Sequence, residues 1–169
     1  MNKKTLERTL DAALSHHRAG QHADADRLYA QIRRAAPRLF DGWFLAGALA
    51  VQSDRPAEAV PLLLRALQIE PASSKTRLFL GMALADTGRF AEAEKPLRAG
   101  LQKHPDYPEA WENLAKTLVE LGRPAEAAEC ELRVNTLRPS GLDSVNDVSN
   151  GTEFERLRNT LRTAGSASS

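Results

Sequence analysis

The sequence predicts an all-α protein, an α-α superhelix of four helix-turn-helix repeats followed by a C-terminal capping helix. Three observations support this fold class. Four prolines follow one another at steps of 34 residues: Pro37, Pro71, Pro105 and Pro139. The phrase Arg-Pro-Ala-Glu-Ala, or a close variant, recurs at 55–59, 89–93 and 123–127. Apolar residues between these marks fall at helical spacing rather than in alternation. A fixed period of this length is the signature of a stacked repeat array.

The prolines set the boundaries of the repeats when each is placed at repeat position 32. Residues 1–5 are then a lead-in, and the four repeats cover 6–39, 40–73, 74–107 and 108–141. Position 20 is alanine in every copy: Ala25, Ala59, Ala93 and Ala127. Position 8 is always small: Ala13, Gly47, Gly81 and Ala115. Since small residues let packed helices approach closely, both positions are expected at helix contacts.

Each repeat is expected to hold two helices separated by a short turn. The turns fall at Gly20, Ser53-Asp54, Gly88 and Gly122, and glycine readily adopts the left-handed conformation that ends a helix. Pro56 and Pro124 follow two residues later, at the first position of the second helix, where a missing N–H costs nothing. The periodic proline then ends the repeat.

This pattern resembles that of the tetratricopeptide repeat family. The family pattern is an aromatic residue, Leu-Gly, a turn, then alanine, a large apolar residue, a small one and proline. Its first half is visible here as Trp-Phe-Leu-Ala-Gly at 43–47, Leu-Phe-Leu-Gly at 78–81 and Trp-Glu-Asn-Leu-Ala at 111–115. The resemblance covers about residues 6–139. It implies a right-handed superhelix that binds proteins.

The resemblance also implies a binding surface, because the family's inner face is formed by positions 2, 5, 6, 9, 12 and 13 of the first helix. These positions give a mostly apolar groove for a partner: Leu10, Leu14, Phe44, Leu45, Ala48, Val51, Leu78, Phe79, Met82 and Asn113. Charged residues form its rim: Glu7, Asp41, Lys75, Asp86, Glu112 and Lys116. Monomers rarely expose such a contiguous apolar patch without using it. We therefore expect the Phe44→Glu, Phe79→Glu double variant to lose its partner while keeping its helicity.

Two alternatives to a free groove stay open. The apolar positions can be occupied by the chain itself or by a second copy, or they can be part of the core between neighbouring helices. The residues that grip acidic chaperone tails in this family are missing apart from Lys75, which disfavours that role.

The last residues depart from the repeat. Residues 142–151 are polar and turn-rich, typical of a linker. Thr152 and Glu155 form a capping-box pattern that opens a helix over 152–164. Phe154, Leu157 and Leu161 lie on one stripe of it, as expected of a helix that caps the array. Residues 165–169 are expected to be disordered.

Composition excludes several classes of function. The net charge is +1, so nothing indicates a nucleic-acid partner, and no apolar stretch is long enough for membrane insertion. The single Cys130 suits a reducing, cytoplasmic location, and its glutamate neighbours raise a thiol pKa, which disfavours a nucleophile. His16, His17 and His22 lack ligand-like partners in sequence, so they are interpreted as structural rather than as a metal site. We expect neither an enzyme nor a cofactor.

The predicted function is a protein-interaction adaptor that binds a protein or peptide with an apolar segment. Two further hypotheses remain. The chain can be the partner-recruiting module of a larger enzyme, because bacterial sulfotransferases, methyltransferases and glycosyltransferases often carry such repeats. It can also be a structural protein that self-associates through the ends of the array or the groove.

Overall fold

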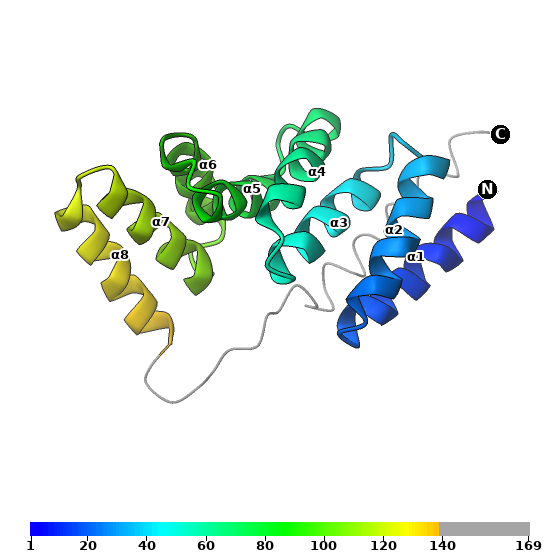
Figure 1. The fold of residues 1–169 in the computed structure, drawn as a ribbon, viewed down its shortest axis with the longest axis horizontal. Helices are drawn as coiled ribbons and strands as arrows, with labels where there is room; N and C mark the ends of the chain where they lie inside the picture. Colours follow the sequence, from blue (N-terminus) through cyan, green and yellow to red (C-terminus); the bar gives the residue numbers. More distant parts are fainter. Residues whose placement is uncertain (139–169) are drawn as a thin grey trace.

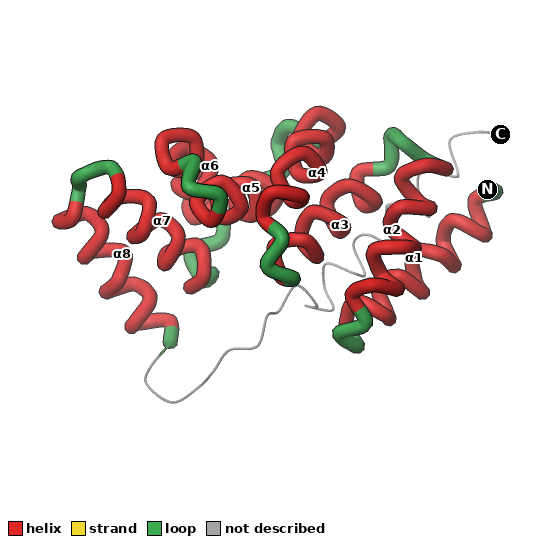
Figure 2. The backbone as a smooth tube through the Cα atoms, viewed as in Figure 1, coloured by secondary structure: helices red, strands yellow, loops and turns green. Residues whose placement is uncertain are grey.

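The computed structural model describes residues 1–138, which form eight α-helices joined by short turns (Figure 1). The helices are α1 (Lys3–Arg18), α2 (His22–Ala35), α3 (Phe40–Gln52), α4 (Pro56–Ile69), α5 (Ser74–Asp86), α6 (Phe90–Lys103), α7 (Pro108–Glu120) and α8 (Pro124–Leu137). Within these residues Figure 2 shows helices and loops only. The predicted all-α class and the four helix pairs are confirmed. The predicted linker, capping helix and tail lie outside the described residues.

The start of the first repeat differs slightly from the prediction. α1 begins at Lys3, inside the predicted lead-in. The side chain of Asn2 is the reason: its Oδ1 accepts a hydrogen bond from the backbone N–H of Thr5 at 2.8 Å. Asparagine at this position satisfies one of the N–H groups that a helix start leaves without a partner. The lead-in therefore adds the first turn of α1.

The turn inside each repeat has the same backbone conformation. Position 15 has a positive φ in all four copies, at 70° for Gly20, 75° for Gly88, 74° for Gly122 and 53° for Asp54. In this region a side chain with a Cβ atom is crowded by the backbone, and glycine is not. The second repeat thus makes its turn with a less suitable residue.

The helices are arranged in two layers. Each odd-numbered helix packs against its own even-numbered partner, and α3, α5 and α7 also pack against the even-numbered helix of the preceding repeat. α3 also contacts α5, and α5 contacts α7, whereas no even-numbered pair packs as extensively. The odd-numbered helices therefore form the inner layer and the even-numbered helices the outer one, along the array seen in Figure 1.

Small residues set the distance between the two helices of a repeat. The alanines at position 20 are at most 2% exposed. At position 8, a Cβ atom on Gly81 would lie 2.6 Å from the Cγ atom of Leu97, and one on Gly47 would lie 2.6 Å from Cγ of Leu63. Such distances leave no space for a further methyl group. The backbone of the first helix at the glycine therefore packs directly against the leucine side chain of the second helix.

Among the described residues, the arginine at repeat position 16 forms an ion pair with the preceding repeat at two of the three repeat boundaries. Arg55 pairs with Asp26 of the first repeat at 2.5 Å, and Arg123 pairs with Glu94 of the third at 2.7 Å. Arg89 occupies the same repeat position, but the residue that would pair with it is the buried Val60. Among residues 1–138, the ion-pair partner of Arg89 is Glu92 of its own repeat, at 2.7 Å.

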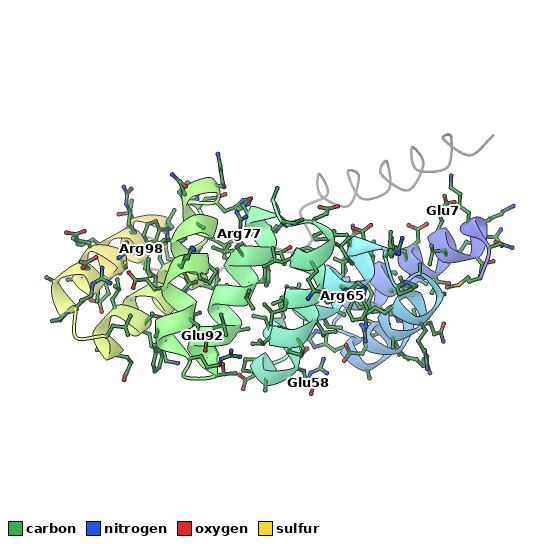
Figure 3. All side chains as sticks on the ribbon, turned by 90° about the horizontal axis from the view of Figure 1, so that it is seen from above. Glu7, Glu58, Arg65, Arg77, Glu92 and Arg98 are labelled. Atoms are coloured by element: carbon green, nitrogen blue, oxygen red, sulfur yellow. The ribbon has the colours of Figure 1, made fainter. Side chains whose placement is uncertain are left out.

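The pair within the repeat recurs along the array. Arg55 contacts Glu58 at 3.0 Å, as Arg89 contacts Glu92. Figure 3 shows Glu58 of α4 and Glu92 of α6 along the same edge of the array. The boundary between the second and third repeats therefore has the internal pair without the cross-repeat pair.

Candidate functional site

Most of the predicted groove residues are not exposed. Eight of the ten are buried, among them Phe44 at 2% exposure and Phe79 at 1%: Leu10, Leu14, Phe44, Leu45, Ala48, Leu78, Phe79 and Met82. Val51 and Asn113 are partly buried. The expectation of a solvent-exposed apolar groove at these eight positions is wrong. They belong to the hydrophobic core, which was one of the alternatives left open.

Aromatic packing accounts for the burial of the two phenylalanines. The rings of Phe40 and Phe44 are stacked with their centroids 5.4 Å apart. Phe44 meets Phe79 edge to face at 5.8 Å, and Phe79 meets Tyr107 at 5.9 Å. These are favourable geometries for aromatic pairs. The row joins the second repeat to the third, so the two phenylalanines form a contact between repeats.

Five of the six predicted rim residues are at least partly exposed, and one is buried. Glu7 and Lys75 are partly exposed, and Asp86, Glu112 and Lys116 are exposed. Asp41 is buried, with 3% of its surface exposed, so its assignment to the rim is wrong. Burial raises the pKa of the Asp41 carboxyl to about 7, and the nearby charge of Glu70 adds to the rise.

An open hollow lies between the two helices of the last repeat, and two predicted rim residues, Glu112 and Lys116, line it. Its volume is about 470 Å³. Residues of α7 and α8 line it: Glu112, Ala115, Lys116, Val119, Glu120, Glu131, Val134 and Asn135. We call it the α7/α8 hollow. Its apolar part is Ala115, Val119 and Val134, and Val119 is 52% exposed. Sequence reasoning found Glu112 and Lys116 but missed the hollow between the helices.

The repeat itself explains why the hollow is open. Glu112, Ala115 and Lys116 occupy the positions that Leu78, Gly81 and Met82 occupy one repeat earlier. Those three are buried, and α7 packs against both helices of their repeat. The α7/α8 hollow therefore corresponds to the surface that receives the next inner helix elsewhere in the array. A charged residue at an otherwise apolar repeat position was the sequence signal that could have identified it.

Acidic groups dominate the rim of the hollow. Arg138 donates hydrogen bonds to Glu112, at 2.6 Å, and to Glu109. The ammonium of Lys116 lies 3.7 Å from Asp86. Glu120 and Glu131 have no ion-pair partner among residues 1–138. The hollow thus combines an apolar floor with two carboxylates able to accept a basic group.

The histidines form a polar contact between the first two repeats. The ring of the buried His17 is hydrogen-bonded through Nδ1 to the hydroxyl of Tyr29 at 3.0 Å and through Nε2 to Oε1 of Gln52 at 2.7 Å. His22 contacts Ser53 at 2.8 Å. Burial lowers the pKa of His17, against the effect of the Gln52 hydrogen bond. These hydrogen bonds join α1 and the start of α2 to the end of the second repeat's inner helix.

Three further sequence predictions concern a metal site, the thiol of Cys130 and membrane insertion. No group of three or more His, Cys, Asp or Glu there has an arrangement that could hold a metal ion. Burial raises the pKa of the Cys130 thiol, and the neighbouring glutamates act in the same direction. None of the helices between residues 1 and 138 combines the length and the apolar character needed to cross a membrane.

Comparison with known families agrees with this repeat architecture. A tetratricopeptide repeat profile matches residues 10–74 and 79–141, and a second one matches residues 50–99. The first covers well over half of the chain, and the chain therefore belongs to the tetratricopeptide repeat family. It is a repeat scaffold of the class whose extended surfaces bind other proteins.

Individual relatives share part of the sequence. The chain is 36% identical over 122 residues to cellulose synthase 2 operon protein C of Komagataeibacter xylinus, with 70% of this chain aligned. It is 29% identical over 131 residues to human tetratricopeptide repeat protein 7B, with 78% aligned. The aligned parts are only 9% and 16% of those proteins.

Solved structures are similar in fold. MamA residues 41 to the end from Desulfovibrio magneticus RS-1 superimposes with a TM-score of 0.68 at 18% identity, covering 85% of this chain and 78% of that one. YrrB, described as a TPR protein with an unusual peptide-binding site, gives 0.64 at 21% identity, covering 86% and 71%. At these identities the likeness is one of fold.

Proposed function

We propose that the protein is an interaction scaffold that binds an amphipathic segment of a partner protein in the α7/α8 hollow. The partner segment is helical and places apolar side chains on Ala115, Val119 and Val134. Its basic groups lie near Glu120 and Glu131. Rim charges of this kind influence specificity and association rate more than affinity. This assignment keeps the predicted protein partner with an apolar segment, but moves it from the buried groove residues to the open end of the array.

The correspondence between repeats is the observation that supports this proposal best. In the second and third repeats, the surface equivalent to the hollow is covered by the next inner helix, which packs on both helices of the repeat before it. The equivalent surfaces of the earlier repeats therefore already bind a helix of the same chain. Laying the apolar face of a helix into a groove is also a common mode of peptide recognition.

Substitutions in the hollow test the proposal. Full-length wild-type protein and a Val119→Asp, Val134→Asp variant are used to capture partners, and each captured protein is quantified. Val119 is exposed, Val134 is partly buried, and neither belongs to the hydrophobic core, so the variant is expected to keep its helical circular dichroism. A carboxylate on the apolar floor should lower capture of the specific partner at least tenfold, because an unpaired charge is desolvated on binding.

The matched control is Leu132→Asp, which adds a carboxylate to a residue of α8 that is 67% exposed and outside the hollow. This variant should capture the partner as the wild type does. A partner that binds all three proteins equally would place the binding surface elsewhere and contradict the proposal.

A further inference from the structure

We infer that Arg33 and Arg65, whose guanidiniums lie over the ring of Trp43, bind the carboxylates of an acidic segment of a partner protein. Arg33 belongs to α2 and Arg65 to α4, where Figure 3 labels it, and both helices are in the outer layer. Their repeat positions, 28 and 26, and position 4 of Trp43 are outside the set that forms the inner face in this family. We call these three residues the Arg-Trp-Arg site. It is independent of the α7/α8 hollow, which lies in the fourth repeat.

A fixed tryptophan ring holds the two guanidiniums together. The central carbon of the Arg33 guanidinium lies 5.6 Å from the centroid of the Trp43 ring, and that of Arg65 lies 5.9 Å from it. Both distances are within the range of a cation–π contact. The ring is kept in place by a hydrogen bond from its Nε1–H to the backbone carbonyl of Pro37. Two like charges are therefore held near one aromatic ring, where an anion would be attracted by both.

The protein compensates the charge of Arg33 only in part. Among residues 1–138, its Nη1 is the buried side-chain polar atom that has no hydrogen-bond partner. Burial lowers the pKa of the Arg33 guanidinium, because the environment disfavours the charged form. Arginine nevertheless stays protonated in proteins. Since Arg33 is only partly buried, a carboxylate that approaches the exposed part of its side chain would stabilise this charge.

The acidic residues of α2 and α4 do not supply that carboxylate, because each of them pairs elsewhere. They are Asp24 and Asp26 in α2 and Glu58 in α4. Asp24 pairs with Arg27 at 2.7 Å. Asp26 and Glu58 both pair with Arg55, at 2.5 Å and 3.0 Å. All three lie in the first half of their helices, so the other ends of α2 and α4 carry the uncompensated arginines.

Further cations lie beside the site. Arg34 is exposed in the last turn of α2, and Arg38 is exposed directly after the proline whose carbonyl holds the indole. Among residues 1–138, neither of them forms an ion pair, and Arg65 donates a hydrogen bond to Oε1 of Gln68 at 2.7 Å in place of one. The positive charge at this boundary between the first and second repeats therefore lacks a carboxylate partner within the described chain.

An acidic protein segment fits the Arg-Trp-Arg site better than a nucleic acid does. A guanidinium presents a planar pair of N–H donors that matches the two oxygens of a carboxylate. Single-stranded nucleic acids stack their bases on aromatic faces, but guanidiniums already lie over the ring of Trp43. The net charge of the chain is only +1, whereas a phosphate backbone is bound by many cations together.

The fourth repeat provides an internal comparison. Trp111 occupies the same repeat position as Trp43, but the residue that corresponds to Arg33 is the buried Leu101. Trp43 and Trp111 are the two tryptophans of the chain. One of them therefore reports on the arginine pair, and the other reports on a repeat that lacks it.

Tryptophan fluorescence of the full-length protein tests the site. In a Trp111→Phe background Trp43 is the only tryptophan, and the protein is titrated at low ionic strength with a hexaglutamate peptide whose ends are blocked. Pairing of its carboxylates with the guanidiniums changes the charge around the indole, so the emission of Trp43 should change and saturate. Added salt should weaken the binding. No response to hexaglutamate, or an equal response to blocked hexaglutamine, would overturn the inference.

Substitution of the two arginines assigns the response to the site. Arg33→Gln with Arg65→Gln, in the same background, should weaken hexaglutamate binding at least tenfold. The matched control is Arg8→Gln with Arg133→Gln, which changes the net charge equally at exposed positions of α1 and α8 and should bind as its parent does. Equal losses in both variants would reduce the effect to overall charge and overturn the site. Arg65 is exposed, so Arg65→Gln alone repeats the test without changing the partly buried Arg33.

Other anions and the hollow are tested with the same reporter. Inorganic phosphate and a hexauridine RNA are titrated under the same conditions, and tighter binding of either one than of hexaglutamate would overturn the assignment to an acidic protein segment. Val119→Asp with Val134→Asp changes the α7/α8 hollow and should leave hexaglutamate binding as it is. A loss of binding in that variant would place the acidic segment in the hollow and overturn the Arg-Trp-Arg site.

Discussion

The indole Nε1–H of Trp111 donates a hydrogen bond to the backbone carbonyl of Pro105 at 2.9 Å. The same bond joins Trp43 to Pro37 at 3.0 Å. In the third repeat, where position 4 is arginine, Arg77 donates to the carbonyl of Pro71 at 2.6 Å. The periodic proline and the position-4 residue are therefore two ends of one contact that ties α3, α5 and α7 to the turn before each of them.

Trp111→Phe is expected to lower the free energy of unfolding by about 0.5–1 kcal/mol, because it removes this one hydrogen bond while keeping most of the apolar ring. Trp43→Phe should lower it by a similar amount. The two contacts lie in different repeats, so the losses should add in the double variant. Urea denaturation followed by circular dichroism measures both. A phenylalanine variant as stable as the wild type would show that the bond contributes nothing.

Asp54→Gly is expected to stabilise the protein by roughly 0.5–1 kcal/mol. Asp54 has a φ of 53°, a conformation that costs a residue with a Cβ atom more than it costs glycine. Ser53→Gly is the control, since Ser53 has a φ of −93° and glycine there relieves no strain. It adds freedom to the unfolded chain and removes the hydrogen bond to His22, so it should destabilise the protein. Thermal unfolding should place the two variants on opposite sides of the wild type, and a common direction would contradict the strain at Asp54.

His17 is expected to make stability depend on pH. Its pKa in the folded protein is lowered from 6.5 by burial, so the unfolded chain binds a proton more readily than the folded one. The stabilisation is present above pH 6.5 and is lost as the pH falls below it. His17→Gln removes this titration. Urea unfolding between pH 5 and 8 should show a smaller loss of stability at acid pH in the variant, and parallel curves would contradict the assignment.

Phe44→Ala is expected to cost about 3–5 kcal/mol, because Phe44 is 2% exposed and packed against Phe79. Phe44→Glu should be worse, since it places a charge in the core. Leu64→Ala, at a residue 46% exposed, is the control and should change stability little. The denaturation midpoint measures each effect. A folded and stable Phe44→Glu protein would restore Phe44 to an exposed binding surface.

The fold could be predicted almost entirely from the sequence, and the site only in part. Proline spacing, the position-20 alanines and the turn glycines depend on contacts within a repeat or between neighbouring repeats, so a periodic sequence records them directly. Burial of side chains on the inner face depends on how closely successive inner helices approach one another. That closeness put Phe44 and Phe79 in contact, and no residue spacing specifies it. The hollow was missed because it arises from a repeat that has no successor among the described residues.

The cross-repeat ion pairs distribute sensitivity to salt unevenly along the molecule. Arg55–Asp26 and Arg123–Glu94 join the outer repeats to the middle two, and each lies at a partly exposed position. The central boundary has the buried Val60 in the corresponding place. Ionic strength weakens exposed charge pairs and leaves apolar contacts nearly unaffected. As the salt concentration rises, the contacts at the first and third repeat boundaries should therefore weaken while the central pair of repeats stays rigid. The α7/α8 hollow lies in the fourth repeat, beyond the third boundary.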